Sequence, residues 1–400
     1  MEGNLIRLNK KLLPLSWLYG AGVGFRNMLF EVGILKSRSY AVPVISVGNI
    51  TVGGTGKTPH VEYLVRLLKH RLKVAVLSRG YKRKSRGFLL ASTDTPMRLL
   101  GDEPWQMKHT FPDIAVAVDK KRTHGIETLL NTDETTDTDV ILLDDAFQHR
   151  YVKPGINILL VDHHRLIIHD LLMPAGRLRE PLKSKDRADI VIVTKCPKTL
   201  TPMEFRVLTK QMNLYPYQKL FFTTFDYEPP RPVFPEGEPL AATTAPMDSL
   251  ANTHVLLLTG IASPKQMLLD IQREATPASI TPMPFADHHR FSPKDIRRIN
   301  ENFEALKEPR LIITTEKDAA RLYEAKGLTP EVRQHIYALP VKVTFMMDGE
   351  EKFNHYIQNY VLKNSRHSIL AKDMDERHDR QPRNKDGDSE RPLVISFRNS

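Results

Sequence analysis

Cysteine is almost absent from this 400-residue chain, which contains a single residue of this type, Cys196. One cysteine excludes an internal disulfide and any cysteine-rich metal cluster, and it suits a reducing compartment. No stretch approaches the roughly 18 uninterrupted apolar residues that a transmembrane helix needs. Near Met1, no small-residue cleavage site follows a compact apolar core. We therefore expect a protein that neither spans a membrane nor is secreted.

Negative charge is also scarce, because 58 Lys and Arg residues oppose 47 Asp and Glu residues, which gives a formal net charge of +11. This balance favours an anionic partner: nucleic acid, an anionic membrane surface or a phosphorylated substrate. The chain has neither an aromatic-basic RNA motif nor a zinc module. We expect no nucleic-acid partner.

A glycine-rich loop is the most informative feature that is present. The apolar run at residues 44–48 leads into Gly-Gly-Thr-Gly-Lys-Thr at residues 53–58, and an amphipathic helical pattern follows. In such a loop the backbone N–H groups surround phosphate, the lysine reaches the outer phosphates and the following hydroxyl binds Mg²⁺. Thr51 stands where the general pattern has its first glycine. The expected nucleotide-binding residues are Thr51, Val52, Gly53, Gly54, Thr55, Gly56, Lys57 and Thr58.

Short apolar runs alternate with helical patterns, which predicts an α/β fold with a mainly parallel, P-loop NTPase-like sheet and flanking helices. A second, smaller α/β domain is expected from further runs beyond a proline-rich segment. The expected strands lie at residues 42–47, 74–77, 114–118, 140–143, 156–161 and 190–193, and then at 254–258, 280–284 and 311–314.

Composition divides the chain into five parts. Residues 228–239 are too rich in proline for core structure and indicate a linker, whereas the residues beyond 363 are highly charged and are expected to be disordered. The expected parts are an N-terminal membrane-interface segment (1–40), a P-loop domain (41–226), which the family resemblance described below implies to be a kinase domain, a linker (227–253), a smaller C-terminal α/β domain (254–362) and a charged tail (363–400).

The segment at residues 12–30 is rich in leucine and aromatic residues and has basic flanks at Lys10, Lys11 and Arg26. This composition is typical of a segment that lies in the interface of an anionic membrane. The alternative is an amphipathic helix that packs on the surface of its own domain.

Polar residues follow several of the expected strands, at the sheet edge where ligands bind in folds of this class. Asp144 and Asp145 end one apolar run, as in a Walker B site, and are expected to hold Mg²⁺ together with Thr58. His149 continues into the same crevice. Arg79 and Tyr81 follow the preceding strand; Arg79 either neutralises phosphate charge or forms a surface ion pair.

Other polar clusters carry weaker signals. Asp102, in the Gly-Asp-Glu-Pro turn at 101–104, is either a proton acceptor or a helix cap. The loop at 174–181 places Arg177, Arg179 and Glu180 together, which suits an anionic substrate or a solvated basic loop. Asp287 precedes two histidines and can orient a base. A metal site there is the competing interpretation, but further ligands at suitable spacing are lacking.

In combination, these motifs resemble the tetraacyldisaccharide 4′-kinase family, the lipid A kinases called LpxK. The resemblance runs in order from about residue 12 to residue 362. Its motifs lie at residues 48–59, 78–81, 101–104, 144–150, 174–181, 287–291 and 314–318.

The resemblance implies a peripheral enzyme on the cytoplasmic face of the bacterial inner membrane, with ATP and Mg²⁺ as cofactors and no obligate protein partner. It would transfer the γ-phosphate of ATP to the 4′-hydroxyl of tetraacyldisaccharide 1-phosphate and form lipid IV_A. The implied base is Asp102, assisted by His288, with His289 left as an alternative. Lys57 and Arg79 complete the catalytic set. The residues implied to line the nucleotide or disaccharide site are Tyr81, Arg122, His149 and Glu180.

A rival class is the membrane-associated ATPases of the partitioning and site-placement type, whose P-loop also contains Gly-Gly-x-Gly-Lys-Thr. They carry a lysine immediately before the two glycines, and here that position is Val52. A GTPase is disfavoured because Thr194-Lys-Cys-Pro lacks the aspartate of the guanine-reading Asn/Thr-Lys-x-Asp motif. Hydrolysis of ATP without dependence on an acceptor would favour the partitioning-type ATPase.

Overall fold

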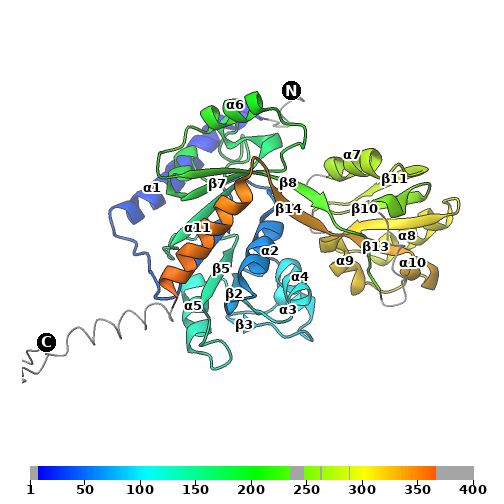
Figure 1. Cartoon of the computed structure of the whole chain (residues 1–400), viewed down its shortest axis with the longest axis horizontal. Coiled ribbons are helices and arrows are strands. Elements are labelled where there is room, and N and C mark those ends of the chain that lie inside the picture. The colour runs from blue at the N-terminus through cyan, green and yellow to red at the C-terminus, as the bar shows by residue number, and fades with distance from the viewer. Residues whose placement is uncertain (1–7, 235–246, 262–263, 288, 366–400) are drawn as a thin grey trace, which may run out of the picture.

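The structure is a computed structural model that describes residues 8–234, 247–261, 264–287 and 289–365. Within these residues the chain forms two α/β units, each a sheet with helices on both faces, joined by a two-stranded ribbon (Figure 1). This arrangement confirms the predicted fold class. Most of the charged tail expected at 363–400 lies outside the described residues.

The larger unit contains a nine-stranded sheet in the order β14-β8-β7-β6-β1-β5-β2-β4-β3. The inner strands are parallel, and the edge strands β14 and β3 run antiparallel to their neighbours. Its strands are β1 (Val44–Gly48), β2 (Val74–Ser78), β3 (Leu89–Leu90), β4 (Ala115–Val118), β5 (Val140–Asp144), β6 (Ile156–Asp162), β7 (Ile190–Thr194), β8 (Lys219–Tyr227) and β14 (Val341–Phe345).

Helices cover both faces of this sheet. The helices of the larger unit are α1 (Leu13–Glu31), α2 (Lys57–Leu68), α3 (Met97–Leu100), α4 (Asp102–Thr110), α5 (Arg122–Asn131), α6 (Pro202–Met212) and α11 (Gly349–Asn364). Apolar side chains of α2, α4 and α11 share one core with the sheet, whereas those of α5 and α6 belong to cores on the other face. The short 3₁₀ helices of the chain are η1 (Lys10–Leu12), η2 (His163–Arg165), η3 (Ile167–His169), η4 (Leu182–Arg187) and η5 (Asp248–Leu250).

The strand order reverses at β1, which lies between β5 and β6. The chain first builds outward through β2 and β4 and then crosses to β6 and β7 on the other side. In open α/β sheets, ligands bind beyond the carboxyl ends of the strands at such a reversal. The loop that follows β1 therefore occupies the expected position for a ligand site.

The smaller unit contains a five-stranded sheet in the order β11-β10-β12-β13-β9. Apolar cores lie on both of its faces, and β9 is its antiparallel edge. Its strands are β9 (Arg231–Pro232), β10 (His254–Thr259), β11 (Ser279–Pro284), β12 (Arg310–Thr315) and β13 (Ile336–Leu339), and its helices are α7 (Pro264–Glu274), α8 (Pro293–Glu304), α9 (Glu316–Tyr323) and α10 (Pro330–Gln334).

The boundaries of the smaller unit differ from those expected. After β13 the chain returns to the larger unit, because β14 pairs with β8 and α11 packs on the larger sheet. The smaller unit is thus an insertion between β8 and β14, and it does not extend to residue 362. The expected linker also contributes structure: β9 pairs with β13, and Phe234 is only 2% exposed in the core. Pairing at a sheet edge tolerates the proline-rich sequence, since an edge strand can lack one N–H.

Helix α1 lies against the larger unit through polar anchors. The Tyr19 hydroxyl donates to the carbonyl of Arg179 at 2.8 Å, and the Ser16 hydroxyl donates to the carbonyl of Leu172 at 2.9 Å. Much of its apolar surface stays uncovered, including Trp17 and Leu18. Among the helices that the structure describes, none combines the length and apolar character needed to cross a bilayer.

Candidate active site

The glycine-rich loop after β1 has the backbone conformation that its glycines permit. Gly53 has φ of 117° and Gly56 has φ of 82°, both in the left-handed region that disfavours side chains. Gly56 caps the N-terminus of α2, and a Cβ there would lie 2.7 Å from Cζ of Phe225. Lys57 therefore begins α2, as predicted, at the positive end of the helix dipole.

Three successive carbonyl groups of this loop are held by side chains behind it. The Lys195 ammonium donates to the carbonyl of Gly54, the Thr194 hydroxyl to the carbonyl of Thr55 at 3.0 Å, and Nδ1 of His60 to the carbonyl of Gly56 at 2.7 Å. In a trans peptide the N–H points opposite to the carbonyl. Anchoring these carbonyls thus turns the following N–H groups away from the protein interior, as an anion site requires.

His60 is held in one tautomer by these contacts. Because Nδ1 donates to a carbonyl, Nε2 acts as the acceptor for the Thr223 hydroxyl at 3.1 Å. Burial lowers the pKa of His60 to about 4. The imidazole is therefore neutral near pH 7 and serves as a fixed hydrogen-bonding bridge between the loop and β8.

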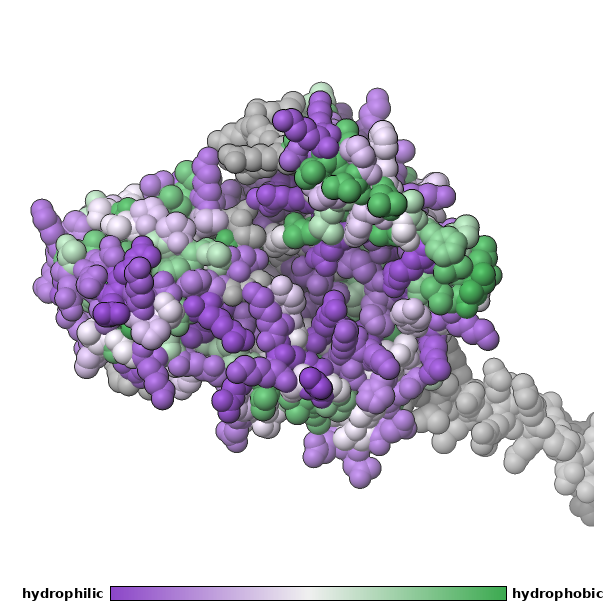
Figure 2. Space-filling view, turned by 180° about the vertical axis from the view of Figure 1, so that it is seen from behind, coloured by the Kyte–Doolittle hydropathy of each residue, from purple (hydrophilic) through white to green (hydrophobic). Residues whose placement is uncertain are grey.

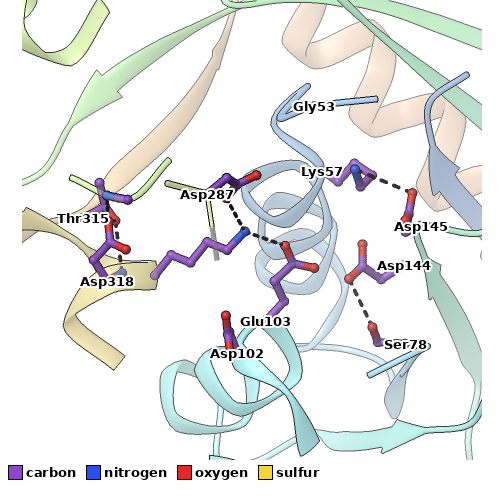
Figure 3. A network of polar contacts seen from close by, with 12 residues as sticks. Gly53, Lys57, Ser78, Asp102, Glu103, Asp144, Asp145, Asp287, Thr315 and Asp318 are labelled. Atoms are coloured by element: carbon purple, nitrogen blue, oxygen red, sulfur yellow. Dashed lines mark hydrogen bonds and ion pairs between the residues drawn. The ribbon is translucent and has the colours of Figure 1, made fainter. Parts of the chain in front are cut away.

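Asp144 and Asp145 lie at the carboxyl end of β5, opposite Lys57 (Figure 3). The Lys57 ammonium is 3.6 Å from Oδ1 of Asp145, and the Ser78 hydroxyl donates to Oδ2 of Asp144 at 3.4 Å. Burial, Glu103 and Asp145 raise the pKa of Asp144 to about 7. Although burial opposes it, Lys57 and Arg179 hold the pKa of Asp145 below its ordinary value. The two neighbouring carboxylates thus differ in their tendency to hold a proton.

These residues fit a magnesium ion. Oδ1 of Asp144 is buried and accepts no hydrogen bond from the described residues. Carboxylate and hydroxyl oxygens are the ligands that Mg²⁺ prefers, and the ion usually keeps several ligands from water and phosphate. Among the described residues no cluster of three or more His, Cys, Asp or Glu side chains is arranged for a metal. The residues that would hold the ion are Asp144, Asp145 and Thr58, through carboxylate and hydroxyl oxygens.

The Gly-Asp-Glu-Pro turn begins α4 and faces the smaller unit. Gly101 has φ of 93° and precedes Asp102, the first residue of the helix. Oδ2 of Asp102 accepts from Nε and Nη2 of Arg321 at 2.8 and 2.7 Å. The Lys317 ammonium lies 3.2 Å from Glu103 and 3.6 Å from Asp287 (Figure 3). Asp102 and Asp287 thus meet at one junction between the two units, through α9.

Of the two histidines that follow Asp287, the structure describes only His289. His288 lies outside the described residues. Nε2 of His289 is 2.9 Å from Oδ2 of Asp295, which also forms the capping box of α8 with Ser292. His289 therefore supports the start of a helix within its own unit.

Three further predicted residues follow strand ends of the larger sheet. Arg79 and Tyr81 come after β2, and His149 comes after β5. Arg79 directly follows β2, and its charge contributes to lowering the pKa of His149. Burial is the main cause of that shift, which brings the pKa of His149 to about 4, so this ring is neutral near pH 7. Tyr81 is 56% exposed. These three residues keep the positions at the sheet edge that the sequence predicts.

Two of the residues predicted to line the site, Arg122 and Glu180, are buried. Arg122 is 1% exposed and donates to the carbonyls of Asp119 and Asp144 at 2.7 and 2.9 Å. Glu180 is 2% exposed and forms an ion pair with Arg187 at 2.6 Å. Burial places both side chains behind the surface, where they support the strand end and the neighbouring loop, and their role in lining the nucleotide or disaccharide site stays a prediction.

The sequence assigned no role to the anchoring residues His60, Thr194, Lys195, Lys317 and Arg321, although Lys317 lies within the motif at 314–318. Thr194 and Lys195 follow β7 directly, and Lys317 and Arg321 lie in the helix that follows β12. The rule that functional side chains gather beyond the strand ends could have found them. In the sequence, Thr194 and Lys195 indicate only an incomplete guanine-binding motif.

Comparison with known proteins agrees with this geometry. Residues 8–362 match the family model described as tetraacyldisaccharide-1-P 4'-kinase, LpxK. Over 372 residues, which are 93% of this chain and 100% of the relative, the chain is 56% identical to a tetraacyldisaccharide 4'-kinase of Phocaeicola vulgatus. It is 50% identical over 375 residues, 93% of this chain and 98% of the relative, to that of Bacteroides thetaiotaomicron.

A solved structure shows the same relationship. The crystal structure of the "apo" form of LpxK from Aquifex aeolicus in complex with ATP superposes with a TM-score of 0.65 at 31% identity, and the match covers 86% of this chain and 98% of that one. The resemblance inferred from the motifs is confirmed. The chain belongs to the tetraacyldisaccharide-1-P 4'-kinase family, LpxK.

Proposed function

We propose that this chain transfers the γ-phosphate of ATP to the 4′-hydroxyl of tetraacyldisaccharide 1-phosphate, forming lipid IV_A in lipid A biosynthesis. The names of its relatives and the ATP complex of its structural neighbour support this activity. The observation that carries it is that Lys57, the Asp144–Asp145 pair and Asp102 lie in one region, where the charge of Glu103, the neighbour of Asp102, acts on Asp144 (Figure 3). A partitioning-type ATPase is disfavoured by the family match across both α/β units.

Phosphoryl transfer depends on alignment and charge neutralisation, and different residues of the site would serve each of these roles. The loop N–H groups and Lys57 bind the β- and γ-phosphates, and Arg79 adds positive charge at the sheet edge. Held by Thr58, Asp144 and Asp145, Mg²⁺ would neutralise charge on the transferred group. Asp102 accepts the proton of the attacking 4′-hydroxyl, with His288 as its proposed assistant.

We further propose that α1 rests on the anionic surface of the bacterial inner membrane, on its cytoplasmic side. Trp17, Leu18 and Phe25 are 71%, 73% and 60% exposed, although burial in an apolar medium would stabilise each of them. Figure 2 shows apolar surface gathered on the side of the molecule where α1 lies. Basic residues near these side chains suit an anionic leaflet. This placement brings the crevice to a substrate whose acyl chains remain in the bilayer.

The test is transfer of label from γ-³²P-ATP to purified tetraacyldisaccharide 1-phosphate in mixed micelles with Mg²⁺. The proposal expects one labelled lipid product, formed by the intact chain and lost in Lys57→Met. Turnover of ATP at the same rate with and without the lipid, and without labelled lipid, would contradict the kinase and favour the ATPase.

A further inference from the structure

Helix α9 presents two cations to the turn that holds Asp102. Lys317 and Arg321 are four residues apart and therefore lie on one face of the helix. Lys317 reaches Glu103 at 3.2 Å, and Arg321 reaches Asp102 at 2.7 Å. Two cations on one face of α9, in the smaller unit, thus form ion pairs with the two consecutive carboxylates at the start of α4.

Arg321 holds Asp102 in a fixed geometry. Its side chain is 5% exposed, and both Nε and Nη2 donate to Oδ2 of Asp102. Its Nη1 donates to Oδ1 of Asp318 at 2.7 Å and to the carbonyl of Gly260 at 3.5 Å. The guanidinium is planar, so bonds to two carboxylates at once determine its orientation.

Asp318 in turn is anchored to the sheet of the smaller unit. It is completely buried, and its Oδ2 accepts from the backbone N–H of Gly260 at 2.7 Å and from the Thr315 hydroxyl at 2.8 Å. Gly260 follows β10 and Thr315 ends β12, which are neighbouring strands. A Cβ at Gly260 would lie 2.7 Å from Oδ1 of Asp318, so glycine permits this approach. A continuous set of bonds therefore links two strand ends to the carboxylate of Asp102.

We propose that Arg321 is a positioning residue for the transfer reaction: it fixes the carboxylate of Asp102 toward the acceptor hydroxyl and makes that orientation depend on the smaller unit. This inference rests on the proposed function, in which Asp102 is the base. A base that rotates out of line loses rate even when its chemistry is intact. In this proposal Arg321 acts through Asp102, the carboxylate that it contacts.

The test is a double-mutant cycle on kcat for lipid phosphorylation with Asp102→Asn, Arg321→Gln and the combined variant. Arg321→Gln is expected to lower kcat by about 10- to 100-fold and to leave the KM for ATP within about twofold. In the Asp102→Asn background, the same change is expected to lower kcat by less than about twofold, because residues that act as a unit are not additive. Fully additive losses, or an unchanged kcat in Arg321→Gln, would overturn the inference.

Two further variants separate positioning from folding. Arg321→Lys keeps the charge beside the buried Asp318 but cannot bond both carboxylates in the same fork, so its kcat should lie between those of the intact chain and Arg321→Gln. A kcat equal to that of the intact chain in Arg321→Lys would also overturn the inference. Arg273→Gln removes an arginine from a surface cluster in α7 and is the matched control. Full activity in Asp102→Asn would contradict the proposed base itself, and the inference with it.

Discussion

At the scale of single residues, the surroundings of a carboxyl group decide how readily it holds a proton. Asp144 and Asp145 are adjacent carboxylates whose pKa values are pushed in opposite directions by their surroundings. Glu62, in α2, is also a buried carboxyl group, and it accepts a hydrogen bond from Gln106 at 3.0 Å. Its burial has a consequence for stability that can be measured.

Stability is predicted to fall with rising pH because of Glu62. Burial, followed by the charge of Glu316, raises the pKa of Glu62 from its ordinary 4.5 to about 8. The folded state thus holds a proton that the unfolded state releases, so this contribution is complete below pH 4.5 and is lost as the pH rises to about 8. Glu62→Gln should flatten this decline and raise the melting temperature at pH 8 by roughly 1–2 °C, which corresponds to about 1 kcal/mol for a chain of this length.

The measurement is thermal unfolding from pH 5 to pH 8.5. Glu134→Gln, at an exposed position, is the control and should keep the slope of the intact chain. An unchanged slope in Glu62→Gln would show that the proton is held elsewhere.

Lys195 provides a test of loop anchoring. Lys195→Gln removes the ammonium that holds the carbonyl of Gly54 and pairs with Asp162 at 2.9 Å. A charged hydrogen bond contributes about 1.5–3 kcal/mol, so the KM for ATP should rise by roughly tenfold or more. Steady-state kinetics at saturating lipid measure this effect. Lys210→Gln, at an exposed position in α6, is the control, and equal KM values for the two variants would refute the anchoring role.

At the scale of elements, the sequence predicted the parallel strands because each is a short apolar run buried on both faces, as β1 and β5 show. The ribbon of β8 and β14 was not predicted. Its two strands are more than a hundred residues apart in the sequence, so no local pattern indicates that they pair with each other. The P-loop and the paired aspartates were found because their signals are local. Arg321 and Lys195 were missed because their partners lie on other elements.

The exposed face of α1 yields a prediction at the same scale. Replacing Trp17 and Leu18 by glutamate should reduce binding to vesicles that contain phosphatidylglycerol by roughly tenfold or more, since each apolar side chain contributes about 1.5–3 kcal/mol on burial. The melting temperature should not change, because both side chains are largely exposed. Vesicle sedimentation measures the effect. Met203→Glu alters another exposed apolar residue, in α6, and should bind like the intact chain; equal binding by the α1 variant would contradict the membrane role.

At the scale of the whole molecule, the smaller unit is inserted between β8 and β14, so the ribbon and the α4–α9 junction both connect it to the larger unit (Figure 1). The proposed base and its positioning arginine come from different units. This arrangement could not be read from the sequence, because composition places a boundary near residue 362, whereas β14 and α11 complete the first sheet and its core. The proposed orientation of the base thus depends on both units.

The central claim is that the P-loop crevice and Asp102 carry out phosphoryl transfer to a lipid hydroxyl. The most direct measurement is single-turnover transfer from γ-³²P-ATP to tetraacyldisaccharide 1-phosphate, with Asp102→Asn compared with the exposed control Asp94→Asn. Loss of a general base costs about 10²- to 10⁴-fold, so the rate should fall at least 100-fold in Asp102→Asn, with ATP affinity unchanged, and stay unchanged in the control. Equal rates of label transfer in both variants would contradict the account.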